Sequence, residues 1–379
     1  MTTSADVTVD VAVIGAGIAG ASAAYEISRT HTVLVLERED QPGYHTTGRS
    51  AALFTENYGN APIRALTIAT RPFLETPPDG FTDRPILTPR GAMFIAPSGK
   101  DDACAHLIES AGDPKRLYEI AVDDAMRRVP IIRKDWLVRA LFEPDAMDID
   151  VHALHQGYLR GLRARNGQIR TGAEVKAMRR ERGHWRIETR SGTVAAAKVV
   201  NAAGAWADEI GGLAGARPIG LVPKRRTAFI VDPPPGLDPG AWPMVCDAEE
   251  QFYFKPDAGR LLASPADATP SPPCDAQPEE MDVAIAVDRI ETATSLSVRR
   301  VVRKWAGLRS FVADGTTVVG ESASAPGFIW LAAQGGYGIQ TSAAMARVAA
   351  ATIRCDGIEK GLSERGVTFA TLSPSRLAA

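Results

Sequence analysis

Residues 7–28 read VTVDVAVIGAGIAGASAAYEIS and decide the fold of the first part of this chain. The run Val7–Ile14 is rich in β-branched residues and is typical of a buried parallel strand. Gly17–Ser28 follows as an alanine-rich helix, and His31–Leu36 is a second strand. The pattern therefore predicts a β-α-β unit with a glycine-rich turn between its first strand and its helix.

That turn has the form G-x-G-x-x-G, with glycines at Gly15, Gly17 and Gly20. The first glycine allows a tight turn, the second lets a pyrophosphate approach the backbone, and the third lets helix and strand pack closely. Glu37 closes the second strand about twenty residues later, the usual spacing for a carboxylate that binds a ribose hydroxyl. An acid at this place disfavours the extra phosphate of NADP, so the motif leaves NAD and FAD open.

Three later segments favour FAD. Gly48–Ala52 puts small residues after a glycine-rich turn, and Val199–Trp206 is a strand that ends in small residues. Gln334–Gly338 leads into an alanine-rich helix from about Ile339 to Ile353. An NAD-binding domain is normally contiguous, whereas this site draws on both ends of the chain. An elongated FAD fits that spread.

Composition narrows the class of protein. The net charge is −2, with acidic and basic residues mixed, so we expect neither nucleic acid nor an anionic membrane as partner. The four cysteines, Cys104, Cys246, Cys274 and Cys355, are scattered, which predicts no metal site and no disulfide framework. We expect neither a signal peptide nor a transmembrane helix, and hence a cytoplasmic protein.

The middle of the chain predicts a second domain. Strand-like segments at Leu221–Val231, Gln251–Lys255 and Arg260–Ala263 are separated by proline-rich loops. We expect an α/β protein in which an α+β substrate domain, built on an antiparallel sheet, is inserted into a Rossmann-like FAD-binding domain. The predicted FAD-binding domain comprises residues 1–76, 150–215 and 305–379, and the predicted substrate domain comprises residues 77–149 and 216–304.

Helix signals also occur outside the first unit. The clearest predicted helix is Val151–Arg165, where Asp150 occupies the N-cap position and Asn166 and Gly167 end the helix. We further expect helices at Ile63–Leu74 and Met281–Thr292, a short strand at Ala92–Ala96, and a hairpin that turns at Gly183.

Several stretches carry a family resemblance. They are QPGYHTTGRSAA (residues 41–52), LHQGYLRG (154–161), NAAGAW (201–206), PKRR (223–226), WAGLRSFVADG (305–315) and AAQGGYGIQTSAA (332–344). In these stretches, and over nearly the whole chain, the sequence resembles the D-amino-acid oxidase (DAO) family of FAD-dependent oxidoreductases, which includes glycine and sarcosine oxidases. Within it the sequence looks most like the bacterial FAD-dependent D-arginine dehydrogenases.

The resemblance implies FAD as cofactor. Some relatives attach the flavin to a cysteine just after the position of Arg309, but residues 310–315 contain no cysteine, so we expect non-covalent FAD. The implied cofactor-binding residues are Gly15, Gly17, Ile18, Ala19, Gly20, Glu37, Arg38, Thr47, Gly48, Arg49, Ser50, Ala51, Ala52, Val175, Ala203, Gly204, Trp206, Gly307, Arg309, Gly335, Gly336, Tyr337, Gly338, Ile339 and Gln340.

The resemblance also implies a substrate site. Arg226 and Arg309 match two arginines that hold the substrate carboxylate, and a guanidinium grips a carboxylate in bidentate fashion. A solvated basic run at Arg226 and a structural ion pair at Arg309 are the alternatives. Tyr58 and Tyr253 match pocket tyrosines that order or cover the substrate, or else are ordinary packing residues. The carbonyl of Gly336 matches an acceptor for the substrate amine.

Leu53, Thr55, Ala92, Met244 and Cys246 match residues that line the substrate pocket. Two of them depart from the D-arginine enzymes, which carry a glutamate at the position of Ala92 and a histidine at the position of Leu53. These changes argue against a long cationic substrate and for an apolar or varied side chain. Glu56, in the predicted lid loop, is a possible replacement for the missing charge.

The expected reaction is oxidative deamination of a D-amino acid to an imino acid, and then a keto acid, by hydride transfer to flavin N5. D over L selectivity follows from the resemblance alone. The alternative is oxidation of a secondary amino acid, N-methyl or cyclic, of the sarcosine or glycine oxidase type. A flavin-bearing subunit without chemistry is a third reading. Lys255 does not decide between a quinone, an electron-transfer protein and O2 as electron acceptor.

Overall fold

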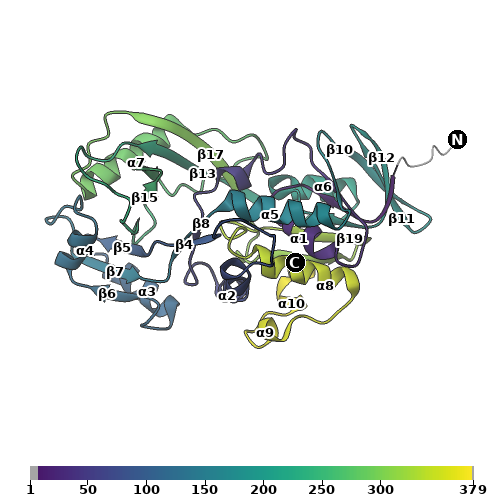
Figure 1. Cartoon of the computed structure of the whole chain (residues 1–379), viewed down its shortest axis with the longest axis horizontal. Coiled ribbons are helices and arrows are strands. Elements are labelled where there is room, and N and C mark those ends of the chain that lie inside the picture. The colour runs from purple at the N-terminus through teal and green to yellow at the C-terminus, as the bar shows by residue number, and fades with distance from the viewer. Residues whose placement is uncertain (1–6, 378–379) are drawn as a thin grey trace.

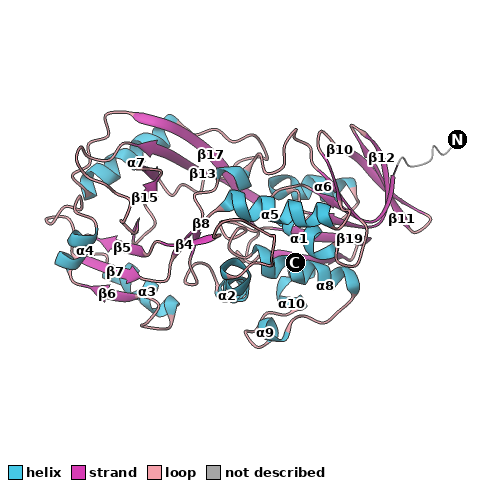
Figure 2. Cartoon of the chain, viewed as in Figure 1, coloured by secondary structure: helices cyan, strands magenta, loops and turns pink. Residues whose placement is uncertain are grey.

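The structure, a computed structural model, describes residues 7–377. Two large sheets lie next to each other along the longest axis of the molecule, and helices cover both (Figures 1 and 2). The first sheet combines strands from residues 7–36, 168–201 and 318–332, and the second sheet combines strands from residues 92–143 and 222–311.

The first sheet has eight strands and a parallel centre. Its strands are β1 (Val7–Ile14), β2 (Val33–Leu36), β9 (Gln168–Arg170), β10 (Val175–Glu181), β11 (His184–Thr189), β12 (Gly192–Asn201), β18 (Val318–Ser322) and β19 (Ala325–Ala332). Strands β9, β2, β1, β12 and β19 pair in parallel in that order. The β10–β11 hairpin, which turns at Gly183 as predicted, and β18 add antiparallel pairs. The carboxyl ends of β1, β2 and β12 therefore meet at one edge.

The predicted β-α-β unit is β1, α1 (Ile18–Ile27) and β2. Gly15 has φ +98°, and a Cβ atom there would lie 2.5 Å from the carbonyl oxygen of Ala202, the residue that follows β12. A Cβ atom on Gly20 would lie 1.8 Å from the carbonyl oxygen of Gly15. Both glycines are required by close backbone contacts between the turn, the helix and the neighbouring strand.

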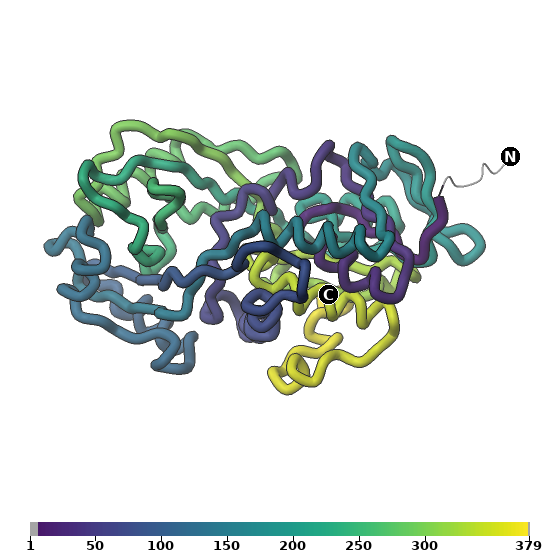
Figure 3. The backbone as a smooth tube through the Cα atoms, viewed as in Figure 1, coloured from purple at the N-terminus to yellow at the C-terminus, as the bar shows by residue number. Residues whose placement is uncertain are grey.

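Helices from both ends and from the middle of the chain pack around the first sheet. They are α1, α2 (Ala61–Glu75), α5 (Val151–Ala164), α6 (Ala207–Leu213), α8 (Ser342–Arg354), α9 (Lys360–Ser363) and α10 (Phe369–Leu372). In Figure 3 the purple N-terminal segment runs beside the yellow C-terminal segment, and α1 and α8 share one buried core with β1 and β2. Segments from both ends of the chain thus contribute to one core.

Local sequence signals predict the ends of α5 correctly but place the start of α8 too early. Asp150 caps α5 by accepting a hydrogen bond from the Ala153 amide at 2.8 Å, and Asn166 adopts φ +61° after the helix, as expected from its position. Helix α8 begins at Ser342, three residues later than predicted. The residues before it form successive turns, in which the amides of Tyr337 and Thr341 donate to the carbonyls of Gln334 and Tyr337.

The second sheet also has eight strands, in the order β17-β13-β16-β15-β14-β5-β7-β6. Their bounds are β5 (Ala92–Ala96), β6 (Tyr118–Ile120), β7 (Arg139–Glu143), β13 (Val222–Val231), β14 (Met244–Asp247), β15 (Tyr253–Asp257), β16 (Arg260–Ser264) and β17 (Val301–Phe311). All neighbours are antiparallel except β14 and β5. The predicted α/β fold with a second unit on an antiparallel sheet is confirmed.

Helices cover one face of this sheet, and the other face borders a cavity. Helices α4 (Val122–Arg128) and α7 (Glu280–Ala293) share a buried core with Met93, Val245 and Phe254 on the covered face. Because side chains alternate along a strand, Ala92, Met244 and Tyr253 point to the opposite face. Helix α3 (Asp101–Ala111) packs at the end of the sheet near β6 and β7.

A third, three-stranded sheet consists of β3 (Leu53–Phe54), β8 (Met147–Ile149) and β4 (Leu87–Pro89). Three short 3-10 helices occur at Thr46–Arg49, Gly204–Trp206 and Pro374–Leu377. The predicted domain limits stay a prediction. Residues 305–311 lie on β17 and so belong to the second sheet, and residues 1–6 and 378–379 lie outside the described part of the chain.

Two negative findings concern the described residues. No helix within residues 7–377 is both long and apolar enough to cross a membrane. The cysteines Cys104, Cys246, Cys274 and Cys355 are all unpaired.

Candidate active site

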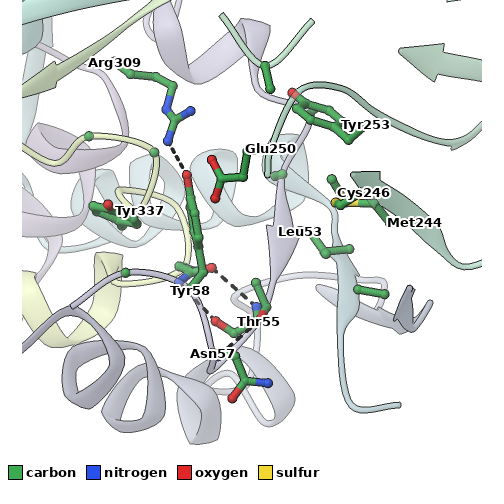
Figure 4. A pocket seen from close by; sticks show the side chains of 18 of the residues that line it. Leu53, Thr55, Asn57, Tyr58, Met244, Cys246, Glu250, Tyr253, Arg309 and Tyr337 are labelled. Atoms are coloured by element: carbon green, nitrogen blue, oxygen red, sulfur yellow. Dashed lines mark hydrogen bonds between the residues drawn. The ribbon is translucent and has the colours of Figure 1, made fainter. Parts of the chain in front are cut away.

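A cavity of about 780 Å³ is lined by residues of both large units. Every residue that the sequence predicts for catalysis or for the substrate pocket lies on its wall, namely Leu53, Thr55, Tyr58, Ala92, Arg226, Met244, Cys246, Tyr253, Arg309 and Gly336. Part of the predicted cofactor set lies there too, namely Ile18, Arg49, Ser50, Ala51, Ala52, Gly307, Gly335, Tyr337, Gly338, Ile339 and Gln340. Figure 4 shows how ten of the side chains surround this space.

The rest of the predicted cofactor set does not line the cavity. It lies at or near the ends of β1, β2, β10 and β12 and in two short 3-10 turns, and comprises Gly15, Gly17, Ala19, Gly20, Glu37, Arg38, Thr47, Gly48, Val175, Ala203, Gly204 and Trp206. The structure thus separates the predicted cofactor residues into a group at the glycine-rich turn and a group on the cavity wall.

At the turn, Glu37 is 7 % exposed and its two carboxylate oxygens are fixed by backbone amides. Oε2 accepts from Ala16 at 2.8 Å and Oε1 accepts from Glu39 at 3.0 Å. Each oxygen has further lone pairs, so the carboxylate can still accept a ribose hydroxyl. Thr47 caps the start of α1 through its hydroxyl, which accepts from the Ile18 amide at 2.9 Å.

At the cavity, three segments far apart in sequence form the wall that would face a flavin ring. They are the stretch from Arg49 to Ala52, the middle of β17 at Gly307, and the turns from Gly335 to Gln340. Arg49 joins the first two by donating to the carbonyl oxygens of Ala276 and Ala306 at 3.0 and 2.9 Å. The amide of Gly335 donates to the carbonyl oxygen of Ser310 on β17 at 2.9 Å, so the third segment is joined to the other two.

Arg226 and Arg309 lie on the same face of the second sheet. Arg226 on β13 is opposite Gly307 on β17, and Arg309 is two residues further along β17. Residues two apart on a strand point to one face, so the two guanidinium groups are diagonal neighbours. This register, which depends on the β13–β17 pairing, brings the predicted arginine pair together.

Both guanidinium groups lack an acidic partner within residues 7–377. The Nε of Arg226 donates to the carbonyl oxygen of Asp267 at 2.7 Å. Arg309 donates to the hydroxyl of Tyr58, while its Nε is buried and has no hydrogen-bond partner. The neighbouring Arg225, by contrast, pairs with Asp282 at 2.8 Å. Because buried charges are normally paired, the free arginines mark a place for an anion on this wall.

Tyrosines close the side of the cavity next to Arg309. Tyr58 and Tyr337 have ring centroids 4.9 Å apart, and Figure 4 shows Tyr58 between Arg309 and Thr55. Burial raises the pKa of Tyr58, and it raises the pKa of Tyr337 to about 12. Both hydroxyls therefore keep their protons at neutral pH.

The opposite wall comes from β14, β15 and β5. Cys246 pairs with Tyr253 across β14 and β15, and Met244 pairs with Ala92 across β14 and β5. Burial raises the pKa of the Cys246 thiol well above its usual value, which keeps it protonated. Together with Leu53 these side chains make this wall largely apolar, as the sequence predicts.

Two polar residues weighed in the sequence are engaged elsewhere. Glu56 forms ion pairs with Arg71 at 2.6 Å and Arg116 at 3.3 Å and does not line the cavity, so it is not the replacement acid. Lys255 pairs with Asp148 at 2.6 Å and is also outside the wall. Their charges are neutralised within the protein.

Sequence reasoning missed three acidic residues on the cavity wall, Glu143, Glu249 and Glu250, of which Glu249 pairs with Lys100 at 2.7 Å. Glu250 lies at the turn between β14 and β15 with φ +56°, where Figure 4 shows it facing the cavity. Glu143 is the last residue of β7 and is directly opposite Ala92 on β5. No motif marks Glu143, because its place on the wall depends on the register between β5 and β7.

Comparisons with known proteins identify relatives of this chain. Residues 10–352 match the family model DAO, described as FAD dependent oxidoreductase. The mitochondrial dimethylglycine dehydrogenase of Rattus norvegicus is 23 % identical over 264 residues, which are 68 % of this chain but 30 % of that protein. The glycine oxidase of Geobacillus kaustophilus (strain HTA426) is 22 % identical over 323 residues, 82 % of this chain and 84 % of that protein.

Solved structures show the same fold. The crystal structure of the Geobacillus kaustophilus glycine oxidase gives a TM-score of 0.83 at 22 % identity, covering 97 % of this chain and 99 % of that one. Iminodiacetate oxidase from Chelativorans sp. BNC1 gives 0.80 at 21 %, covering 96 % and 98 %. L-α-glycerophosphate oxidase from Mycoplasma pneumoniae, with FAD bound, gives 0.82 at 17 %, covering 92 % and 95 %. At these identities the likeness concerns the fold.

Proposed function

Because the chain belongs to the DAO family of FAD dependent oxidoreductases, matched over residues 10–352, we propose that it oxidises the carbon–nitrogen bond of a small amino acid. The observation that carries the proposal is the pair Arg226 and Arg309. Two guanidinium groups without acidic partners lie on the wall that also contains the predicted flavin-facing residues. A carboxylate is the anion that such a pair suits.

FAD is the cofactor of this family, and the residues present fit it. The backbone at Gly15 and Gly20 is free of side chains, and Glu37 is held where a ribose hydroxyl would be bound. Gly307 and the turns from Gly335 to Gln340 would face the ring. When bound, FAD supplies the acceptor for the hydride that leaves the substrate carbon.

The protein's part is to bind and orient the substrate. Arg309 and Arg226 would hold the carboxylate, and Tyr58, whose hydroxyl accepts a hydrogen bond from Arg309, would cover it. The carbonyl of Gly336 would accept from the amine. These contacts would fix the orientation of the carbon–hydrogen bond that is broken, and orientation lowers the barrier of the reaction. The proposed scheme needs no general base. The oxidised product is an imine, which water hydrolyses to a carbonyl compound and an amine.

We propose a secondary or N-substituted amino acid as the preferred substrate. The relatives named for glycine, dimethylglycine and iminodiacetate support it, since their substrates are small amino acids whose nitrogen carries varied substituents. The chain spans about 30 % of the length of the dimethylglycine dehydrogenase, so the activity of that whole protein is only a guide. The electron acceptor, whether a quinone, an electron-transfer protein or O2, stays open to experiment.

A D-amino acid is the second candidate. The cavity extends beyond Ala92 to Leu107 on α3, which leaves room for a side chain on the α-carbon. The resemblance to D-arginine dehydrogenases supports this candidate, although the family glutamate is replaced by Ala92. Non-covalent FAD is proposed for either candidate.

Anaerobic mixing tests the proposal. The holoenzyme is mixed with glycine, sarcosine, N,N-dimethylglycine, and D- and L-amino acids, and loss of the oxidised flavin absorbance is followed. We expect N-substituted glycines to bleach the flavin fastest. Fastest bleaching by D-amino acids would favour the second candidate, and no bleaching by any amino acid would overturn the proposed function. Arg309→Met holoenzyme with full FAD content is the matched control and should bleach far more slowly.

A further inference from the structure

Glu143 is a buried acid, and one of its two carboxylate oxygens has no hydrogen-bond partner. It is 2 % exposed, lines the cavity, and forms no ion pair within the described chain. Its Oε1 accepts from the hydroxyl of Thr55 at 2.6 Å, whereas its Oε2 is buried and has no hydrogen-bond partner. An unpartnered carboxylate oxygen away from water is costly unless a donor reaches it.

A second unused acceptor lies next to it. The side chain of Asn57 is near enough to oppose the rise that burial causes in the pKa of Glu143. Asn57 Oδ1 is nevertheless buried without a partner, and so is Glu143 Oε2. Asn57 also lines the cavity, and Figure 4 shows it beside Thr55. Two orphan acceptor atoms from different elements, the end of β7 and the loop after β3, therefore meet on one part of the wall.

No cationic side chain of the described chain serves these acceptors. Arg71 on α2 and Arg116 are paired with Glu56, and Arg64 on α2 lines the cavity without forming an ion pair with Glu143. Across the strands, Ala92 is opposite Glu143 and Met244 is opposite Ala92, and neither side chain carries an N–H or O–H donor. The described chain supplies no cation to Glu143 Oε2 or Asn57 Oδ1, so a cationic group of a ligand in the cavity can complete the site.

We propose that Glu143 and Asn57 form a second recognition point for the substrate, which binds a nitrogen cation or N–H donor remote from the carboxylate held by Arg309. A cation suits the site because it would pair with the carboxylate and also donate to the amide oxygen. The substrate class is then a carboxylate-bearing amine with a further basic nitrogen. This inference rests on the proposed function, since it takes the arginine pair as the carboxylate site.

Isosteric ligand pairs test the proposal directly. N-(2-aminoethyl)glycine and N-propylglycine differ in a terminal ammonium or methyl group, and so do D-ornithine and D-norleucine. Wild-type holoenzyme and Glu143→Gln are compared above pH 7 by anaerobic flavin bleaching. We expect wild type to favour the ammonium member of at least one pair by about tenfold or more in kcat/KM, and Glu143→Gln to lose that preference.

A binding measurement separates this inference from the proposed function. The dissociation constants of 5-aminopentanoate and hexanoate, which are not α-amino acids, are measured by ligand-induced change in unfolding temperature and in flavin absorbance. We expect 5-aminopentanoate to bind wild type more tightly and Glu143→Gln to bind both alike. If no amine bleaches the flavin, the proposed function fails, yet this pair still decides whether Glu143 recognises a cation.

Two further variants serve as controls for the Glu143→Gln experiment. Glu250→Gln removes an exposed carboxylate of the same cavity and should keep the preference for the ammonium member. Asn57→Ala removes the other acceptor from a loop and should weaken that preference even if Glu143→Gln folds poorly. The proposal is overturned if wild type does not prefer the ammonium ligands, or if the preference survives both Glu143→Gln and Asn57→Ala.

Discussion

The guanidinium of Arg309 packs directly on the backbone of Gly336. A Cβ atom built on Gly336 would lie 2.3 Å from Nη2 and 2.7 Å from Cζ of Arg309. On its other side the same guanidinium donates to the Tyr58 hydroxyl. The absence of a side chain at Gly336 thus sets the position of the arginine that we expect to bind the carboxylate.

Gly336→Ala should therefore impair the site without preventing folding. The new methyl group would push the guanidinium away from its place beside Tyr58, and we expect kcat/KM to fall by about 100-fold, since small displacements of positioning groups have effects of that size. FAD content and unfolding temperature should change little. Gly212→Ala on α6, where a Cβ atom meets nothing within 4 Å, is the control. Normal kinetics of Gly336→Ala would show that Arg309 tolerates displacement.

Arg309→Met should be more severe than Arg226→Met. Arg309 has a buried Nε without a partner, whereas Arg226 also contacts the Asp267 carbonyl at 2.7 Å. Truncating one partner of a buried charge pair costs roughly 2–5 kcal/mol, so kcat/KM with the best substrate should fall by about 30-fold or more in Arg309→Met. Steady-state kinetics and carboxylate inhibitor binding measure this. Equal small effects in both variants would place the carboxylate elsewhere.

Glu37→Gln should weaken FAD binding. The carboxylate fixes the Ala16 amide at 2.8 Å and would also accept from the ribose, and a hydrogen bond to a charged group contributes roughly 1.5–3 kcal/mol. The dissociation constant of FAD should rise about tenfold to a hundredfold, as measured by titrating apoprotein with FAD. Acid precipitation of wild type should leave the yellow flavin in the supernatant. Flavin that stays with the precipitate would contradict non-covalent binding.

Glu143 should make stability depend on pH. Burial raises its pKa from 4.5 to about 7, so between these values the folded state holds a proton that the unfolded state releases. This contribution therefore favours folding at low pH and is lost as pH rises to about 7, by up to roughly 3 kcal/mol. Glu56 and Asp145 add to the rise in the pKa of Glu143, while Thr55 and Asn57 oppose it.

Glu143→Gln should accordingly be more stable than wild type above pH 7, with the difference shrinking towards pH 5. Urea unfolding of FAD-saturated protein at several pH values measures the free energy of unfolding for both. Glu250→Gln controls for the loss of one negative charge. Parallel pH curves for wild type and Glu143→Gln would mean that Glu143 is already ionised in the folded protein near pH 5.

Local sequence signals predicted most of the fold. The β-α-β unit, the capped helix after Asp150 and the hairpin at Gly183 depend on residues close together in the chain, and all are present. The fold class followed from the order of these elements. What local signals could not supply was the pairing of strands distant in sequence, such as β17 with β13, which extends the second sheet to Phe311.

The same distinction applies to the site. Arginines and glycines inside recognisable motifs could be named in advance, and they lie together on one wall. Glu143 belongs to no motif, and it reaches the cavity because β5 and β7 pair in a register that sets it opposite Ala92. Glu56, in the predicted lid loop, is neutralised by Arg71 and Arg116, residues from outside that loop. Side-chain partners of this kind depend on tertiary contacts.

The pairing of Ala92 with Glu143 changes what a glutamate at position 92 would do. Sequence comparison alone suggests that Ala92→Glu raises activity on D-arginine. Ala92 and Glu143 are 1 % and 2 % exposed and directly opposite, so the variant would set two buried carboxyl groups against each other. We expect Ala92→Glu alone to lower the free energy of unfolding by roughly 1–3 kcal/mol with little gain on D-arginine.

The double variant Ala92→Glu/Glu143→Gln should behave differently. It retains one buried carboxyl group in the cavity but moves it from β7 to β5, where the D-arginine enzymes resembled by this sequence carry theirs. Stability should return towards that of wild type because the like-charge pair is removed, and kcat/KM for D-arginine should exceed that of either single variant. Thermal unfolding and anaerobic flavin reduction measure the two effects. If Ala92→Glu alone is as stable and as active as the double variant, the two side chains do not interact, and the acid at position 143 plays no part in this side of the cavity.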